Sequence, residues 1–577
     1  MNYLRLSTVD YLLFTCTFGL SCLVGLYFGF CHKQTTTSDY LLGGRKMKGF
    51  PVAMSLVAST ISGVGLIAVP AEVYMYGFQI AVLALAVILM ALITNFVYLP
   101  VFYELHLSSM NQYLEIRFDK TIKTIASLLY VLSCLLLMPF LIYAPSLAFN
   151  QMTGISVHVI ASIMAIVCIF YTTIGGLKAV VWSDTIQLML TLCTLSFVLV
   201  MGTISVGGVG EIWEKSKQGD RTELFNMSFD PTIRNTFWTV FIGSTFNWLL
   251  FLSVNPSGVQ RFISISKLNE SKRALLLFSV LTATTKLISC FSGLILYTKY
   301  FDCDPLSAGY TKKPDQILPY YVLDVASEIP GISGLFVAGL FSTALSTLST
   351  HLNTIAGVVY LDFMKLWMPK NFSEKKASAI IKMLTFFIGV CNIGFMFIMQ
   401  KLGSLLELFH CANGITGGAI LGVFTLGMLF PMANSKGALA GVISSLIFSS
   451  VIIITNQIYL WNGAIKFIPK PLHIYGCNNT HGGGNLTNIL TSAFPTVEEN
   501  LPPWLFRISY HYYIMVGTLM TVAVGLIVSA VTKNEKDIKY DKKLFSPCLR
   551  KFLPKRPNED QDLKLLNTNL LISDSHI

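Results

Sequence analysis

Long apolar segments alternate with short polar ones along nearly the whole chain. Apolar runs of about 20 residues are long enough to cross a bilayer core of roughly 30 Å. We therefore predict an all-α polytopic membrane protein with about thirteen spans. They lie near residues 9–30, 50–76, 80–103, 124–150, 156–175, 180–204, 236–256, 274–298, 331–362, 378–400, 406–430, 437–457 and 509–531.

The second apolar segment is interrupted near its middle. Ser62, Gly63 and Gly65 break the run, and Pro70 and Glu72 follow before it ends. Unwound backbone at membrane depth is tolerated where it is buried in protein or lines a cavity. In secondary transporters such breaks mark the binding site. The alternative explanation is a close helix-packing face made of small residues.

Composition agrees with a membrane protein, because 53% of the residues are apolar and only 12% are charged. The sequence contains no nucleophile elbow, P-loop, HExxH motif or paired catalytic carboxylates, so an enzyme is a poor fit. Most of the 12 cysteines fall inside apolar runs and are interpreted as small core residues. Cys303 and Cys477 differ, because both lie in polar loops on the same predicted side, where a disulfide between them is an open alternative.

The positive charges predict the orientation. With the N-terminus outside, the inward segments hold 28 of the 41 Lys and Arg residues. We therefore expect a plasma-membrane protein with an extracellular N-terminus, a retained first helix and a cytosolic C-terminus, and we ascribe the net charge of +11 to topology rather than to nucleic-acid binding. The sequons at Asn226, Asn478 and Asn485 fall in outward loops and are predicted glycosylation sites, whereas those at Asn269 and Asn371 fall inside.

Six motifs follow one another in a characteristic order. They are DYLLGGRKM with PVAMSLVAST (39–60), PAEVYMYG (70–77), YTTIGGLKAVVWSDTIQ (171–187), NPSGVQRFIS (255–264), PDQILPYYV (314–322) and GLFSTALSTLSTHLNT (339–354). Through them the chain resembles the sodium:solute symporter family from about residue 9 to 531. The PAEVY form, with APSLAFN (144–150) and TFWT (236–239), is more similar to the multivitamin, monocarboxylate and iodide transporters than to the sugar transporters.

The resemblance implies a leucine-transporter-like fold with a five-plus-five inverted repeat. Both halves should begin with a discontinuous helix, and the seventh segment does end in the sequence VNPSG at residues 254–258. The expected organisation is as follows: 1–48, the N-terminal helix and first cytosolic loop; 49–430, the transport core with repeats 49–204 and 236–430; 431–531, two C-terminal helices with a glycosylated loop; and 532–577, a largely disordered basic tail that touches membrane lipid.

The ninth segment carries hydroxyl groups at helical spacing, with Thr343, Ser346, Thr347 and Thr350 on one face. Oxygen ligands suit a hard cation. The resemblance implies Na⁺ as the co-transported ion. It implies five ligands, namely the carbonyls of Ala58, Ile61 and Thr343 and the side-chain oxygens of Ser346 and Thr347. Ser and Thr also bond back to their own helix, which is what we expect of Ser349 and Thr350.

The substrate pocket is expected beside the interrupted second segment. Its candidate lining residues are Ser62, Gly63, Gly65, Asn247, Trp248, Phe251 and Lys286. Lys286 lies in the middle of the eighth segment, where an ionisable residue is a functional candidate. It contacts a substrate carboxylate, pairs with Glu72 or Glu407, or snorkels toward the interface. The two aromatic residues either stack on an apolar substrate body or pack against neighbouring helices.

The sequence departs from the family pattern at three places. Met75 stands where relatives commonly have Arg. This chain has Asn255-Pro256 where relatives commonly have Asn-Gln. Gly65 stands where the iodide transporters have a larger or polar residue. Our first hypothesis is sodium-coupled import of a small organic anion, a monocarboxylate or a vitamin such as biotin or pantothenate. The alternatives are iodide, a neutral solute such as a sugar, choline or myo-inositol, and a sodium-conducting sensor. The oligomeric state stays open.

Overall fold

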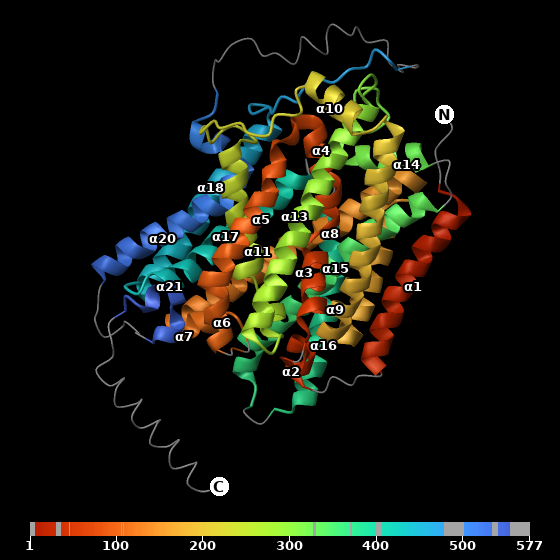
Figure 1. Cartoon of the computed structure of the whole chain (residues 1–577). Coiled ribbons are helices and arrows are strands. Elements are labelled where there is room, and N and C mark those ends of the chain that lie inside the picture. The colour runs from red at the N-terminus through yellow and green to blue at the C-terminus, as the bar shows by residue number, and fades with distance from the viewer. Residues whose placement is uncertain are drawn as a thin grey trace, which may run out of the picture.

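The computed structural model of the 577-residue chain describes residues 6–30, 36–45, 47–105, 107, 109–326, 331–369, 372–399, 405–477, 501–532 and 541–553. Within these ranges all regular secondary structure is helical. The described residues also contain an isolated parallel β-bridge between Met47 and Ile265. Figure 1 shows a bundle of long helices, with α10 near one end and α2 and α7 near the other.

The bundle consists mainly of long helices. They are α1 (Thr8–Phe30), α3 (Gly49–Thr60), α4 (Gly63–Tyr76), α5 (Leu83–Ile93), α6 (Leu99–Leu105), α8 (Lys120–Thr153), α9 (Val157–Ser205), α11 (Ser244–Ser253), α12 (Pro256–Ile263), α13 (Leu268–Lys299), α15 (Ile332–Val358), α16 (Glu374–Met399), α17 (Leu405–Leu429), α18 (Ser435–Trp461) and α20 (Tyr513–Val531).

Shorter helices connect and cap them. They are α2 (Thr37–Leu42), α7 (Gln112–Arg117), α10 (Val209–Gln218), α14 (Ile317–Ala326) and α21 (Pro547–Arg550). Single π-helical turns are η3 (Thr94–Tyr98), η4 (Thr239–Gly243) and η6 (Val359–Phe363). The 3₁₀ turns are η1 (Gly43–Arg45), η2 (Phe78–Val82), η5 (Pro314–Gln316), η7 (Met364–Trp367), η8 (Trp504–Arg507), η9 (Tyr510–Tyr512) and η11 (Lys542–Leu544).

The helices have the length and apolarity of a multi-pass membrane protein. Among the described residues, nine helical stretches qualify as membrane spans, or ten if the bent pair α3–α4 is one span. Helix α9 is two helices joined at Gly176, whose φ of 55° is non-helical, and these correspond to the predicted segments 156–175 and 180–204. All thirteen predicted segments overlap a helix, and thirteen complete crossings stays a prediction.

The predicted interruption of the second segment is present but shorter than expected. Helices α3 and α4 meet at an angle of 56°. Only Ile61 and Ser62 separate them, because the Ser62 hydroxyl caps α4 by accepting a hydrogen bond from the Gly65 amide at 3.2 Å. The seventh segment is also discontinuous, since α11 ends at Ser253 and α12 begins at Pro256 behind an Asn255 cap.

Helix α15 lies in the middle of the bundle, packed against α9, α8 and α1. The first helix, α1, is hydrogen-bonded to the N-terminal end of α15. The Asp10 carboxylate on α1 accepts hydrogen bonds from the Gly331 and Gly334 amides at 3.0 and 2.7 Å. These are amides at the N-terminal end of α15, where a carboxylate is favourable. Helix α15, which carries the hydroxyl face, is therefore anchored to α1 at its N-terminal end.

Three loops cover the α10 end of the bundle. A disulfide joins Cys303 to Cys477, so the pairing left open by the sequence is present. The buried guanidinium of Arg221 donates to the carbonyls of Tyr74 at 2.7 Å and Pro471 at 3.0 Å. We call this cover, formed by residues 219–223, 300–312 and 466–477, the lid. It connects the end of α4 to segments far away in the sequence.

A folded segment covers part of the opposite end. Residues 541–553, which we expected to belong to a disordered tail, form η11 and α21. Phe545 is fully buried, and the Tyr113 hydroxyl donates to the Leu544 carbonyl at 3.0 Å. The Arg550 guanidinium lies 2.8 Å from the Glu104 carboxylate on α6. The apolar residues Leu544 and Phe545 explain why this segment is ordered, because both side chains are buried against the helix bundle.

The predicted glycosylation sites are only partly described. Asn226 lies in the loop between α10 and η4 and is partly exposed. Asn478 and Asn485 lie outside the described residues, as does Asn371, while Asn269 is in the first turn of α13. Glycosylation at Asn226 stays a prediction.

Candidate functional site

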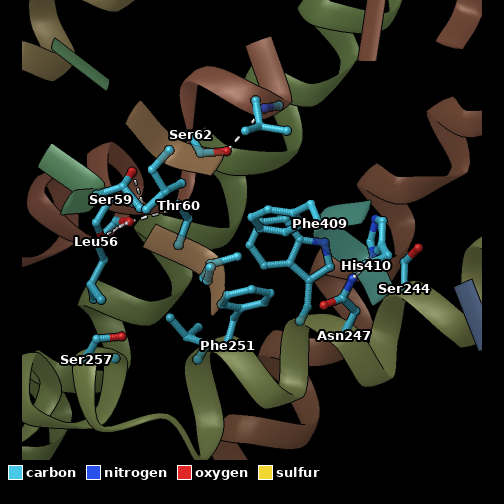
Figure 2. Close-up of a pocket in the computed structure, with 18 of the residues that line it drawn as sticks. Leu56, Ser59, Thr60, Ser62, Ser244, Asn247, Phe251, Ser257, Phe409 and His410 are labelled. Atoms are coloured by element: carbon cyan, nitrogen blue, oxygen red, sulfur yellow. Dashed lines mark hydrogen bonds between the residues drawn. The ribbon is translucent and has the colours of Figure 1, made fainter. Parts of the chain in front are cut away.

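A cavity opens where the α3–α4 break faces α11, α13 and α17 (Figure 2). Six of the seven predicted substrate residues line it, namely Ser62, Gly65, Asn247, Trp248, Phe251 and Lys286. Gly63 does not line it and faces the helix neighbours Pro145 and Leu340. In the described part of the chain, the lining includes no Asp or Glu side chain.

Lys286 on α13 is the unpaired cation of this cavity. No hydrogen bond or ion pair joins its ammonium group to another described residue. Its Nζ lies 5.9 Å from the Trp248 ring centre. A Cβ placed on Gly65 would be 3.1 Å from the same Nζ, so the absence of a side chain on α4 makes room for the ammonium group. Pairing with Glu72 or Glu407 is not present, because both face Arg234.

Aromatic rings form the apolar wall of the cavity. The Phe251 and Phe409 rings from α11 and α17 are nearly parallel, at 13° with centroids 6.0 Å apart (Figure 2). Trp248 lines the cavity and also packs edge-on against Phe278 at 6.4 Å. Trp248 and Phe251 therefore pack on neighbouring rings and also line the cavity, while stacking on a substrate stays a prediction.

Three histidines that sequence reasoning missed line the cavity, namely His351, His410 and His511. His351 Nδ1 on α15 lies 3.7 Å from Cys134 Sγ. His410 Nδ1 on α17 lies 2.8 Å from Asn247 Nδ2 on α11. His511 lies between Ser244 and Asn235, with 3.2 Å to each. A lone histidine in an apolar helix gives little signal in a single sequence. Their role depends on which helices face each other, and that pairing is visible only in the fold.

The hydroxyl face of α15 meets the end of α3. The Thr347 hydroxyl lies 3.0 Å from the Ser59 carbonyl and 2.9 Å from the Thr343 carbonyl. Ser346 Oγ is buried without a hydrogen-bond partner among the described residues. Ala58 and Ile61 are buried at the same helix end. Of the predicted sodium residues, Thr347 is the one whose side chain directly joins the two helices.

Two further hydroxyls on α15 behave as expected of ordinary helix residues. Ser349 Oγ and Thr350 Oγ1 both donate to the Ser346 carbonyl, at 3.0 and 2.9 Å. The prediction that these two bond back to their own helix is confirmed. This leaves Ser346 Oγ as a buried hydroxyl on this face without such a bond in the described residues.

Arg261 is a second cation at the cavity, and it is neutralised. Its Nη2 lies 2.7 Å from Asp184 Oδ2, and both side chains are almost completely buried. It also donates to the Ser59 and Thr350 hydroxyls. Arg261 thus joins α12 to α3, α9 and α15 in the interior. Its charge is therefore already balanced without a substrate.

A buried polar cluster lies between the cavity and the lid. Arg234 donates to both oxygens of Glu72, with distances of 2.6 and 3.0 Å, and lies 3.6 Å from Glu407. The Asn235 amide donates to Glu72 at 2.9 Å. The rings of Tyr76, Phe467 and Tyr510 surround the guanidinium at 4.5 to 5.0 Å. This Arg234 cluster connects α4, α17 and η9.

The chain is similar to known transporters over most of its length. The sequence model of the sodium:solute symporter family matches residues 40–445. The chain is 36% identical to sodium-coupled monocarboxylate transporter 1 of Xenopus laevis, covering 97% of this chain and 92% of that protein. It is 34% identical to a putative sodium-dependent multivitamin transporter of Drosophila melanogaster, covering 90% and 86%.

One solved structure has the same fold. It is the substrate-bound outward-open state of a Na⁺-coupled sialic acid symporter, with a TM-score of 0.74 and 24% sequence identity. The match covers 91% of this chain and 98% of that chain. The expected fold class is thereby confirmed.

Proposed function

The chain belongs to the sodium:solute symporter family, and we propose that it imports a small organic monoanion across the plasma membrane. It is a sodium-coupled symporter and not an enzyme, with Na⁺ as the co-transported ion. The substrate class, the residues that bind it and the orientation are the parts that we propose. Alternating access in this fold brings the central cavity to each side in turn.

The unpaired ammonium group of Lys286 carries the proposal. A charge buried in a membrane protein is expensive unless it has a partner. Arg261, the other cation at the cavity, already has Asp184. No described carboxylate lines the cavity, so the partner of Lys286 has to come with the substrate. A single net positive charge favours a monoanion, because a dianion would leave one charge unbalanced.

Two features support a carboxylate with an apolar body. The N-terminal end of α4, at Ser62 and Gly65, faces the cavity and favours negative charge. The Phe251 and Phe409 rings offer a flat apolar wall. The names of the relatives, monocarboxylate and multivitamin transporters, fit this chemistry. A neutral sugar or choline gives Lys286 no counter-charge, and iodide has no apolar body for the rings.

For sodium we propose the α3–α15 junction. The ligands are the carbonyls of Ala58, Ile61 and Thr343 and the side-chain oxygens of Ser346 and Thr347. The support is the short approach of Thr347 to the Ser59 carbonyl and the buried, unpartnered Ser346 hydroxyl. Neutral oxygens of this kind suit a hard monovalent cation.

We place the lid outside and residues 541–553 in the cytosol. The excess of Lys and Arg in the inward segments supports this orientation. The Cys303–Cys477 disulfide gives independent support, because disulfides persist in oxidising compartments and are rare in the cytosol. The partly exposed sequon at Asn226 lies in the loop between α10 and η4, toward the same end.

Uptake measurements in expressing cells test the substrate class. Labelled lactate, nicotinate, biotin, glucose and choline, and iodide, are supplied with Na⁺ or with an inert cation. We expect Na⁺-dependent accumulation of at least one monocarboxylate. Lys286→Met should raise its half-saturation concentration about tenfold to a hundredfold, the value of a hydrogen bond to a charged group.

Lys299→Met is the matched control, because Lys299 is on the same helix, outside the cavity, and one-third exposed. It should leave uptake unchanged. Transport of glucose or choline unaffected by Lys286→Met would contradict the proposal. Flux of Na⁺ without accumulation of any solute would favour the sensor instead.

A further inference from the structure

With the amide nitrogen of Asn247 facing His410 Nδ1, the contact assigns the proton of the imidazole to one ring nitrogen. An amide nitrogen only donates hydrogen bonds. Since Asn247 Nδ2 lies 2.8 Å from His410 Nδ1, the ring nitrogen accepts, and the proton of the neutral imidazole is on Nε2 (Figure 2). Asn247 therefore turns the other end of the ring into a hydrogen-bond donor.

His410 Nε2 has no acceptor within the described part of the chain, although the residue lines the cavity. His511 differs in this respect. Its two ring nitrogens lie 3.2 Å from Ser244 Oγ and Asn235 Oδ1, so both are occupied. Of His410 and His511, His410 is the one that keeps a ring nitrogen without a partner in the described residues.

The donor is placed among the groups that the substrate is expected to touch. His410 follows Phe409, whose ring stacks on Phe251. Lys286 and His410 both line this cavity. A carboxylate has two oxygens with about four acceptor sites, which exceeds what one ammonium group uses. A second donor beside the cation is therefore suited to the remaining oxygen.

We propose that His410 is a second anchor of the substrate carboxylate, donating from Nε2 to one oxygen while Lys286 balances the charge. This inference rests on the proposed function and assigns it a specificity residue. Asn247 is a positioning residue, because it acts on the substrate through the ring. The substrate carboxylate would thus bind between the charged ammonium group of Lys286 and the neutral N–H of His410.

Uptake of labelled propanoate and labelled lactate by the full chain in Na⁺ tests the assignment. His410→Phe should raise the half-saturation concentration of both acids about tenfold or more, because the carboxylate is the group that they share. The amount at the surface and the half-saturation for Na⁺ should not change. His410→Gln keeps an N–H donor on a side chain of comparable reach, so it should restore most of the affinity.

His158→Phe is the matched control, because this histidine stacks on Phe397 at 4.8 Å and does not line the cavity. It should behave as the wild type. Asn247→Ala should weaken both acids less than His410→Phe. Adding it to His410→Phe should have no further effect, because the two residues act as one unit.

Unchanged affinity in His410→Phe would overturn the inference and leave the proposed function standing. The same holds if only lactate is affected, since that would place His410 at the 2-hydroxyl. If His410→Phe does not reach the surface, Asn247→Ala decides, with unchanged affinity for both acids overturning the inference. Wild-type protein that takes up no monocarboxylate would overturn both proposals.

Discussion

At the scale of single residues, Thr347 connects the two helices that any cation at the α3–α15 junction has to touch. Its hydroxyl reaches the Ser59 carbonyl of α3 from the middle of α15. Ser346, one position before it, has a buried hydroxyl that finds no partner in the described residues. A buried unsatisfied hydroxyl is unfavourable, and a bound cation would satisfy it.

Replacing both residues should lower the affinity for Na⁺ more than it lowers the stability of the fold. We expect Ser346→Ala with Thr347→Ala to raise the Na⁺ concentration for half-maximal uptake by about tenfold, or about 1.4 kcal/mol. Ser349→Ala is the control, because that hydroxyl bonds back to the Ser346 carbonyl and does not line the cavity. Sodium-activation curves, corrected for surface amount, give the answer, and an unshifted curve in the double variant would refute the site.

Residue-level sequence reasoning succeeded where a side chain was unusual for its segment. Lys286 was identifiable as a charge in an apolar run, and it does line the cavity. Gly65 was identifiable from the interrupted run, and its missing Cβ does leave space for Lys286. His410 was not identifiable, because its meaning depends on Asn247, which is 163 positions away.

At the scale of elements, the Arg234 cluster holds α4, the second half of the broken helix. Glu72 is on α4, Glu407 is on α17, and Arg234 precedes η4. The paired Arg234 and Glu72 side chains are 8% and 5% exposed, so solvent screens them little. Any movement of α4 relative to α17 has to rearrange this ion pair.

Breaking the pair on one side should destabilise the protein strongly. Arg234→Gln leaves Glu72 buried without its charge partner, which typically costs about 3–5 kcal/mol. Adding Glu72→Gln removes the unbalanced charge, so the double variant should be more stable than the single one. Thermal unfolding of the detergent-solubilised protein measures this. Arg273→Gln is the control, because Arg273 is an exposed residue of α13. A single variant that melts with the wild type would disprove this role.

The elements themselves were predictable because a helix break leaves a local signature. The sequence placed the first interruption across residues 62–65, whereas the structure has it at Ile61 and Ser62. The reason is capping, since Ser62 starts α4 and draws both glycines into its first turn. Asn255 and Pro256 start α12 in the same way.

At the scale of the whole molecule, distant segments meet at the lid. Arg221 contacts Pro471 across 250 positions, and the Tyr74 hydroxyl donates to Asp304 at 2.6 Å. Sequence patterns do not contain such pairings, so neither the lid nor the docking of residues 541–553 was predicted. The spans were predicted, because each depends only on its own apolarity.

Removing the disulfide should loosen the lid and leave sodium coupling intact. We expect Cys303→Ser with Cys477→Ser to lower the free energy of unfolding by about 2–4 kcal/mol. Replacement of Cys193 and Cys391, two exposed free cysteines, serves as the control. Thermal unfolding and Na⁺-dependent uptake are measured together. Equal melting temperatures for both pairs would show that the bond contributes nothing.

The Cys303–Cys477 disulfide can form only late during synthesis of the chain. Its two cysteines are separated by 174 residues. At roughly 5–20 residues per second, the ribosome needs about 10 to 35 s to deliver the second thiol after the first. Helices α15, α16, α17 and α18 have to be synthesised during that interval. Cys303 must therefore stay reduced, or be exchanged later, until most of the bundle has left the ribosome.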